Sequence, residues 1–158
     1  MIAVVGCGNP NRQDDGVGPA IIRMLRERRL ASLDVRLFDA GTDGMSVMFA
    51  ARGCSCLIVV DAASSGSAPG AIFEVPGGEL ARPYRPGLNM HDFRWDAAIY
   101  TGQQILRDQF PGDVTVLLIE AQDLGLGIGL SDVVSAAAMV VAEKIVTMIG
   151  ERTAGSMA

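Results

Sequence analysis

The sequence predicts a three-layer α/β/α sandwich with a five-stranded, mostly parallel twisted sheet and one antiparallel edge strand. Short apolar runs of strand length alternate along the chain with longer segments of helical period, an order typical of a parallel sheet covered by helices on both faces. The 158 residues, of which 49% are hydrophobic and 20% charged, are enough to bury one sizeable core. We therefore expect a single α/β domain over residues 1–150 and a flexible tail over residues 151–158.

The predicted strands differ in how strongly they favour burial on both faces. Residues 2–5 are a continuous apolar run closed by Gly6, which is typical of a parallel strand inside a sheet. Residues 71–75 are less apolar and lie between two Pro-Gly pairs, so they are the best candidate for the antiparallel edge strand. The predicted strands cover residues 2–5, 35–38, 57–60, 71–75 and 114–119.

The helices are predicted from apolar spacing and from their end signals. Pro19 suits a first helical turn, and Ser131 can cap the last helix, which we expect to stop at Gly150. The predicted helices cover about residues 19–30, 45–52, 92–109 and 132–149, and residues 79–90 are expected to form an irregular loop.

Composition and charge exclude several classes of protein. The net charge is −5, and we find no basic stripe of the kind that nucleic-acid binding needs. No apolar run reaches the roughly 18 residues of a membrane span, so no membrane insertion is expected. The three cysteines are an odd number, and the spacing of Cys54 and Cys56 does not suit a disulfide. We expect a cytoplasmic protein.

The loop after the first predicted strand, Gly6-Cys7-Gly8, opens like a dinucleotide-binding fingerprint. Asn11 stands where that motif has its third glycine. A nucleotide-binding oxidoreductase is therefore a weak alternative. The sequence contains no G-K-[ST], G-x-S-x-G or H-E-x-x-H, which excludes P-loop, serine hydrolase and zincin motifs.

Acidic residues follow the predicted strands at the edge where α/β sheets bind their ligands. Asp14 and Asp15 precede the first helix, and capping is the simplest role for Asp14. Asp61 ends an apolar strand; it either caps a turn with Ser64 or Ser65 or faces a site at a solvent-facing rim.

His91 is the only histidine and precedes a predicted helix. The dipole at a helix amino end disfavours the charged imidazolium, so this ring can offer a lone pair to a metal. Two carboxylates and a neutral imidazole suit a divalent transition metal, although the three residues lie far apart in sequence. Cys7 is more consistent with a small buried residue than with a nucleophile, and Trp95 with an anchor of its helix.

The ordered set of motifs resembles the hydrogenase maturation proteases over roughly residues 2–147. The resemblance rests on His91 before a helix, on Gly-Ile-Gly-Leu-Ser before the last helix, and on Gly6-x-Gly8-Asn9, Asp14-Asp15-Gly16-x-Gly18, Asp39-x-Gly41-Thr42-x-Gly44 and Asp61-Ala62.

This resemblance implies an endopeptidase that removes the carboxy-terminal extension of a nickel-iron hydrogenase large-subunit precursor after nickel insertion, with the bound metal as recognition signal. It implies that Asp15, Asp61 and His91 form the metal-binding trio. Nickel would be carried by the precursor, and another divalent metal could occupy the isolated site.

The resemblance also implies that residues 41–43 (Gly41, Thr42 and Asp43) position the substrate. We expect Asp15 and Asp61 to be catalytic, through either an aspartic-type mechanism or a metal-assisted one. The alternative function is a non-catalytic nickel- or precursor-binding maturation module, which the same three residues would also serve. The residues around His91 depart from the family's usual context, which points to a distinct hydrogenase partner.

Overall fold

A five-stranded mixed sheet forms the centre of the protein. The computed structural model describes residues 1–28, 30, 34–83 and 94–155. The strand order is β2-β1-β3-β5-β4, in which β4 is an edge strand antiparallel to β5 and the other neighbours are parallel. The predicted fold class and the antiparallel edge are thus confirmed. The strands are β1 (Ile2–Cys7), β2 (Val35–Gly41), β3 (Cys56–Ala63), β4 (Ile72–Pro76) and β5 (Asp113–Glu120).

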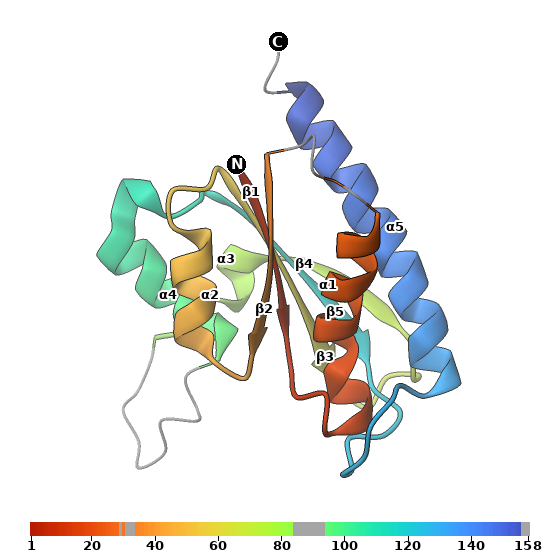
Figure 1. Ribbon diagram of the computed structural model, residues 1–158. Coiled ribbons are helices and arrows are strands. Elements are labelled where there is room, and N and C mark those ends of the chain that lie inside the picture. The colour runs from red at the N-terminus through yellow and green to blue at the C-terminus, as the bar shows by residue number, and fades with distance from the viewer. Residues whose placement is uncertain (29, 31–33, 84–93, 156–158) are drawn as a thin grey trace.

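Helices cover both faces of the sheet, as Figure 1 shows. On one face lie α1 (Val17–Glu27) and α5 (Asp132–Gly155). On the other face lie α2 (Gly44–Ala51), the short α3 (Gly77–Leu80) and α4 (Trp95–Leu106). Two 3-10 turns, η1 (Gln13–Gly16) and η4 (Arg107–Gln109), complete the described elements.

Two buried clusters fill the spaces between these layers. Alternate residues of β1 point to opposite faces, so that Ile2 and Val4 pack with α1 and α5 while Ala3 and Val5 pack with α2 and α4. We call these the α1/α5 cluster, which includes Ile145, and the α2/α4 cluster, which includes Trp95. Because a central parallel strand is covered on both faces, it is apolar at every position.

The last helix, α5, is longer than the sequence predicts. α5 continues to Gly155, five residues beyond the expected stop at Gly150. Arg152 Nε lies 2.7 Å from Asp113 Oδ2, at the start of β5. A glycine inside a helix costs only about 1 kcal/mol, which the preceding turns of this long helix and the Arg152 contact can offset. Residues 151–155 are therefore not a flexible tail.

Two further segments differ from the sequence prediction or lie partly outside the described residues. α3 (Gly77–Leu80) overlaps the start of the segment expected to be an irregular loop, residues 79–90. Of the predicted helix over residues 92–109, residues 92 and 93 lie outside the described residues, and the last three form η4.

By length and apolar composition, α5 could cross a membrane, with a mean hydropathy of 1.8 over its most apolar window. The sequence analysis missed this because it considered only uninterrupted apolar runs. In this fold the helix packs on α1 and on the sheet through a stripe that includes Val134, Val141 and Ile145. Core helices of this kind pass the same length test, so the helix by itself indicates no membrane segment.

Candidate active site

Asp15 lies in the loop from β1 to α1, which follows the carboxyl end of β1. This end of β1 is the lower one in Figure 1. Asp15 Oδ2 accepts a hydrogen bond from the backbone N–H of Asn9 at 2.8 Å. Gly8 has a φ of +127°, and a Cβ there would overlap the carbonyl oxygen of Asp15. A glycine at position 8 is therefore what allows the two ends of this loop to meet and fixes the place of Asp15.

Asp14 has a different role from the one predicted. Its side chain is fully buried and accepts hydrogen bonds from the backbone N–H groups of Gln122, Asp123 and Ser131 and from the Ser131 hydroxyl, at 2.7–3.0 Å. Burial alone would raise the pKa of Asp14, but these hydrogen bonds lower it on balance. Asp14 thus does not cap α1; it ties the β1–α1 loop to the loop before α5.

Asp61, in β3, faces the site rather than a serine-capped turn. It is only 2% exposed, so the expectation of a solvent-facing position is wrong for this residue. Oδ1 accepts from the backbone N–H of Ala62 at 2.8 Å, and Oδ2 accepts from Arg94 Nη2 at 2.9 Å and from Trp95 Nε1 at 2.8 Å. Burial raises the pKa of Asp61 above its ordinary value, and the charge and hydrogen bonds of its partners offset only part of that rise.

The loop from β2 to α2 contributes the residues predicted to position the substrate. Gly41 has a φ of +55° and donates its N–H to Asp39 Oδ1 at 2.9 Å. Asp43 caps α2: its side chain accepts from the N–H of Met45 at 2.9 Å and from the Ser46 hydroxyl at 2.6 Å. Asp43 therefore has a structural role, and its role toward a substrate stays a prediction.

These three regions meet around one pocket of about 200 Å³. Asp15, in η1, and Asp61, in β3, both line it together with the predicted positioning loop, although they are far apart in sequence. Of the predicted site residues, the structure thus brings together Asp15, Asp61 and the Gly41–Asp43 loop. The full lining consists of Cys7, Gly8, Asp15, Gly41, Thr42, Asp43, Gly44, Asp61, Arg94 and Trp95.

Cys7 lines the pocket as a buried residue. It is 7% exposed, which confirms the prediction of a buried residue. Burial raises the pKa of the Cys7 thiol well above its ordinary value, and the neighbouring Asp61 carboxylate raises it further. A thiol in this state is a poor nucleophile, so the structure does not favour Cys7 as a nucleophile.

The pocket supplies part of a metal-binding set. Asp15 Oδ1 accepts no hydrogen bond from the described residues, so it has free lone pairs to offer a cation. No three histidine, cysteine or acidic side chains within the described ranges are grouped as a metal site. His91, the predicted third ligand, lies outside those ranges. Two carboxylates on one pocket fit a divalent cation that a third donor completes.

Arg94 and Trp95 are site residues that the sequence analysis missed. The predicted anchoring role of Trp95 agrees with its burial in the α2/α4 cluster, and its indole N–H also donates to Asp61. One signal was available in the sequence. Both residues stand at the start of the helix that follows His91, and that position brings them to the same edge of the sheet as Asp61.

Comparison with known proteins identifies the family of this chain. A family model described as "Hydrogenase maturation protease" matches residues 19–148, which is most of the chain and most of the described fold. The chain belongs to the hydrogenase maturation protease family. The expected resemblance is thereby confirmed.

Individual members of the hydrogenase maturation protease family differ in how much of this chain they match. The Hydrogenase 2 maturation protease of Escherichia coli K12 is 26% identical over 95% of this chain and 91% of its own length. The hydrogenase expression/formation protein HupM of Azotobacter chroococcum is 37% identical over 51% of this chain and 39% of its own length. This chain thus spans about two fifths of the length of HupM but nearly all of the length of the E. coli protease.

A solved structure of this family has the same fold. The hydrogenase maturating endopeptidase HybD from E. coli superimposes with a TM-score of 0.77, at 24% identity, over 96% of this chain and 93% of that one. At this identity the likeness establishes the fold.

Proposed function

We propose that this protein is an endopeptidase that removes the carboxy-terminal extension of a nickel-iron hydrogenase large-subunit precursor after nickel has been inserted. The observation that carries the proposal is the pocket in which Asp15 and Asp61 converge beside the Gly41–Asp43 loop. Membership of the maturation protease family supports the reaction class. The nickel belongs to the precursor and enters the pocket as part of the substrate.

The two carboxylates have different surroundings and therefore different roles. Asp61 is held by three hydrogen bonds, of which the one from Arg94 is also an ion pair, so its orientation is preset. Asp15 has one oxygen without a described donor and is the better acceptor of a proton from water. No hydrogen bond joins Asp15 to Asp61 within the described part of the chain, which favours activation of a water over a proton shared by two aspartates.

An exposed apolar loop that contacts the β1–α1 loop also suits a protein substrate. The loop between β5 and α5 is tied to the β1–α1 loop through Asp14. Its Leu126 and Ile128 are 85% and 88% exposed, and large apolar side chains that are this exposed are commonly covered by a partner. A folded precursor docked here would bring its carboxyl end to the pocket. We further propose that the reaction takes place in the cytoplasm, in keeping with the three free cysteines.

The test is a processing assay with purified protein and nickel-loaded precursor, read as the mass lost from the precursor's carboxyl end. We expect Asp15→Asn and Asp61→Asn each to slow processing at least about 100-fold, the usual effect of removing a catalytic acid or base. His91→Ala should slow processing and weaken binding of Ni²⁺ together. Asp108→Asn, which changes an exposed carboxylate in η4, is the matched control.

Circular dichroism melting curves separate loss of the site from loss of the fold, which matters most for the buried Asp61. Wild-type processing by Asp15→Asn or Asp61→Asn would remove that residue from the mechanism. Precursor binding without any loss of mass in the wild-type protein would instead establish the alternative, a non-catalytic nickel- or precursor-binding module.

A further inference from the structure

Two neighbouring residues at the start of α4 bind the same oxygen of Asp61. Arg94 Nη2 and Trp95 Nε1 donate to Asp61 Oδ2 at 2.9 and 2.8 Å, while Ala62 N donates to Oδ1. A carboxylate offers about four lone-pair positions, so three of the four at Asp61 are taken. With respect to the described residues, one position, on Oδ1, is left for another partner.

The two donors differ in how firmly the protein holds them. Trp95 is 9% exposed and packed inside the α2/α4 cluster, so its indole cannot leave without opening the core. The Arg94 side chain is 61% exposed although its partner Asp61 is 3% exposed. Arg94 also precedes the first residue of α4 and makes no side-chain capping bond there. The guanidinium can therefore move into water without disturbing a packed element.

The charge of the buried Asp61 carboxylate has to be compensated. A buried carboxylate stays ionised when hydrogen-bond donors or an opposite charge compensate it, and Arg94 is the cation that the described residues pair with Asp61. A divalent cation in the pocket would compensate Asp61 as well, but it would repel a guanidinium that stayed on the same oxygen. Arg94 and a divalent cation would thus compete for the same carboxylate.

We propose that Arg94 is a displaceable counter-cation, which occupies Asp61 in the metal-free protein and leaves it when a divalent cation binds, while Trp95 keeps the carboxylate in place. This inference rests on the proposed function, in which Asp61 contacts the metal. Arg94 is then a positioning residue. It compensates the charge of Asp61 in the metal-free protein and lowers the affinity of the site for a metal ion, so that only an ion with other good ligands displaces it from Asp61.

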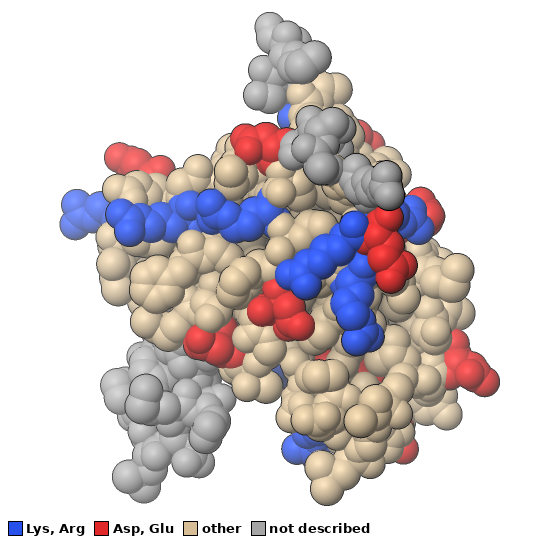
Figure 2. Space-filling view, in the orientation of Figure 1, with Lys and Arg blue, Asp and Glu red and all other residues tan. Residues whose placement is uncertain are grey.

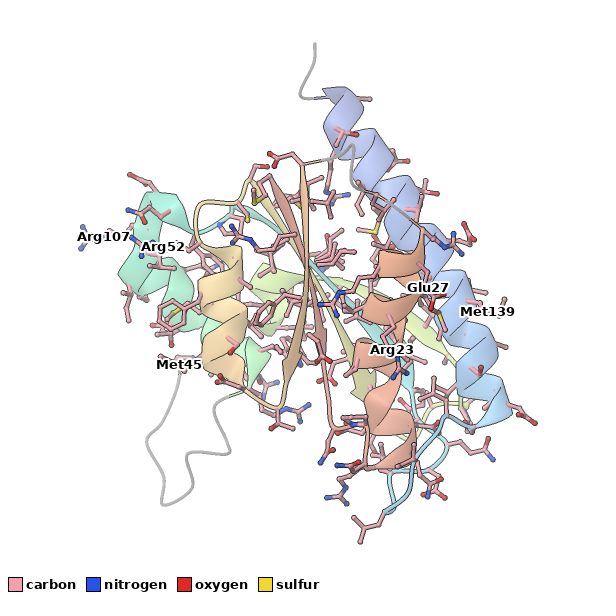
Figure 3. All side chains as sticks on the ribbon, viewed as in Figure 1. Arg23, Glu27, Met45, Arg52, Arg107 and Met139 are labelled. Carbon is pink, nitrogen blue, oxygen red and sulfur yellow. The ribbon has the colours of Figure 1, made fainter. Side chains whose placement is uncertain are left out.

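The test compares Ni²⁺ affinity by calorimetry in variants of the full chain. We expect Arg94→Gln to bind Ni²⁺ at least about tenfold more tightly than the wild-type protein, and Arg94→Lys, which keeps the charge, to stay within about threefold of it. Arg23→Gln removes an exposed arginine on α1 (Figure 3) and should leave the affinity unchanged. Binding seen only in Arg94→Gln would also support the proposal.

A second measurement needs no variant. Nitrogen-15 spectra of the wild-type protein should show the Arg94 side-chain resonance moving to the position of an exposed arginine as Zn²⁺ saturates the site, while the indole N–H of Trp95, the only tryptophan, stays protected from exchange. This readout holds even if Arg94→Gln folds poorly.

Weaker or equal Ni²⁺ binding by Arg94→Gln, no binding by either protein, or an Arg94 resonance unmoved by Zn²⁺ would each overturn the proposal. Its failure is distinguishable from failure of the proposed function. If Asp15→Asn and Asp61→Asn abolish processing while Arg94→Gln binds Ni²⁺ as the wild-type protein does, only the role of Arg94 is wrong.

Discussion

Asp14 and Asp15 are adjacent in sequence yet serve different parts of the molecule. In the 3-10 turn η1, one carboxylate points into the loop before α5 and the other into the pocket. Asp14 is surrounded by four donors, whereas Asp15 accepts one described hydrogen bond and keeps an oxygen free. The first arrangement stabilises a loop, and the second leaves a carboxylate available for chemistry.

We predict that Asp14→Asn destabilises the protein by about 2–4 kcal/mol, because an amide can accept only at its oxygen and its NH₂ would face buried N–H donors. Denaturant unfolding measures this change. Asp123→Asn is the control: Asp123 Oδ1 accepts from Gly125 N in an exposed turn, and the amide oxygen can replace it, so a loss below about 0.5 kcal/mol is expected. Equal losses of unfolding free energy in the two variants would show that the hydrogen bonds to Asp14 contribute no more to stability than the one to Asp123.

The same residue predicts a dependence of stability on pH. Although burial opposes it, hydrogen bonding holds the pKa of Asp14 below its ordinary value. The stabilisation is therefore complete above about pH 4, the ordinary aspartate pKa, and is lost as the pH falls through the lower folded value. The difference between wild-type protein and Asp14→Asn should shrink correspondingly in acid.

At the scale of elements, the β1–α1 unit is held together by close contacts at its glycines. Gly18, in α1, lies so close to the backbone of Cys7 that a Cβ would overlap it. Gly8 has positive φ as well as a close approach to Asp15. The helix can thus begin almost in contact with the end of the strand, and this contact is what holds Asp15 at the pocket.

We predict that Gly8→Ala destabilises the protein by at least about 2 kcal/mol, since an L side chain at this φ is strained and its Cβ meets the Asp15 carbonyl. Metal binding should weaken too, because Asp15 must shift. Gly112→Ala is the control: its Cβ would meet nothing within 4 Å and its φ is not positive. Normal Ni²⁺ affinity in a folded Gly8→Ala protein would contradict the role given to this contact.

At the scale of the whole molecule, the two buried clusters share one sheet and should unfold together. Acidic and basic side chains are interspersed on the face shown in Figure 2, so repulsion between like charges does not destabilise the folded state on that face. The α1/α5 and α2/α4 clusters alternate along the same central strands. Loss of either cluster would uncover one face of β1 and β3, the strands against which the other cluster also packs.

We therefore predict that Ile145→Ala, a change in the α1/α5 cluster, destabilises the protein by about 2–5 kcal/mol and lowers the midpoint seen by Trp95 fluorescence as much as that seen by helix dichroism. Met139→Ala, on the same helix but 62% exposed (Figure 3), should change stability by less than about 0.5 kcal/mol. Separate midpoints for the two probes would mean that the two faces unfold independently.

The sequence by itself determined the fold class, the five strands, the antiparallel edge and the candidate carboxylates. These features are local: an apolar run long enough for a strand, a Pro-Gly pair or an acid after a strand can be read within a few residues. Helix ends were less certain, because the contact between Arg152 and Asp113 joins residues 39 apart and extends α5 past Gly150.

Only the tertiary structure decided which acid does what. Sequence treated Asp14 as a cap and left Asp61 between a turn and a site, because the donors around them come from the loop before α5 and from the start of α4. A side chain's burial and partners depend on which distant segments pack against it, and those distances are set by the sheet order β2-β1-β3-β5-β4. Asp15 and Asp61 share a pocket because β1 and β3 are neighbours in that order, although 46 positions separate the two residues in the chain.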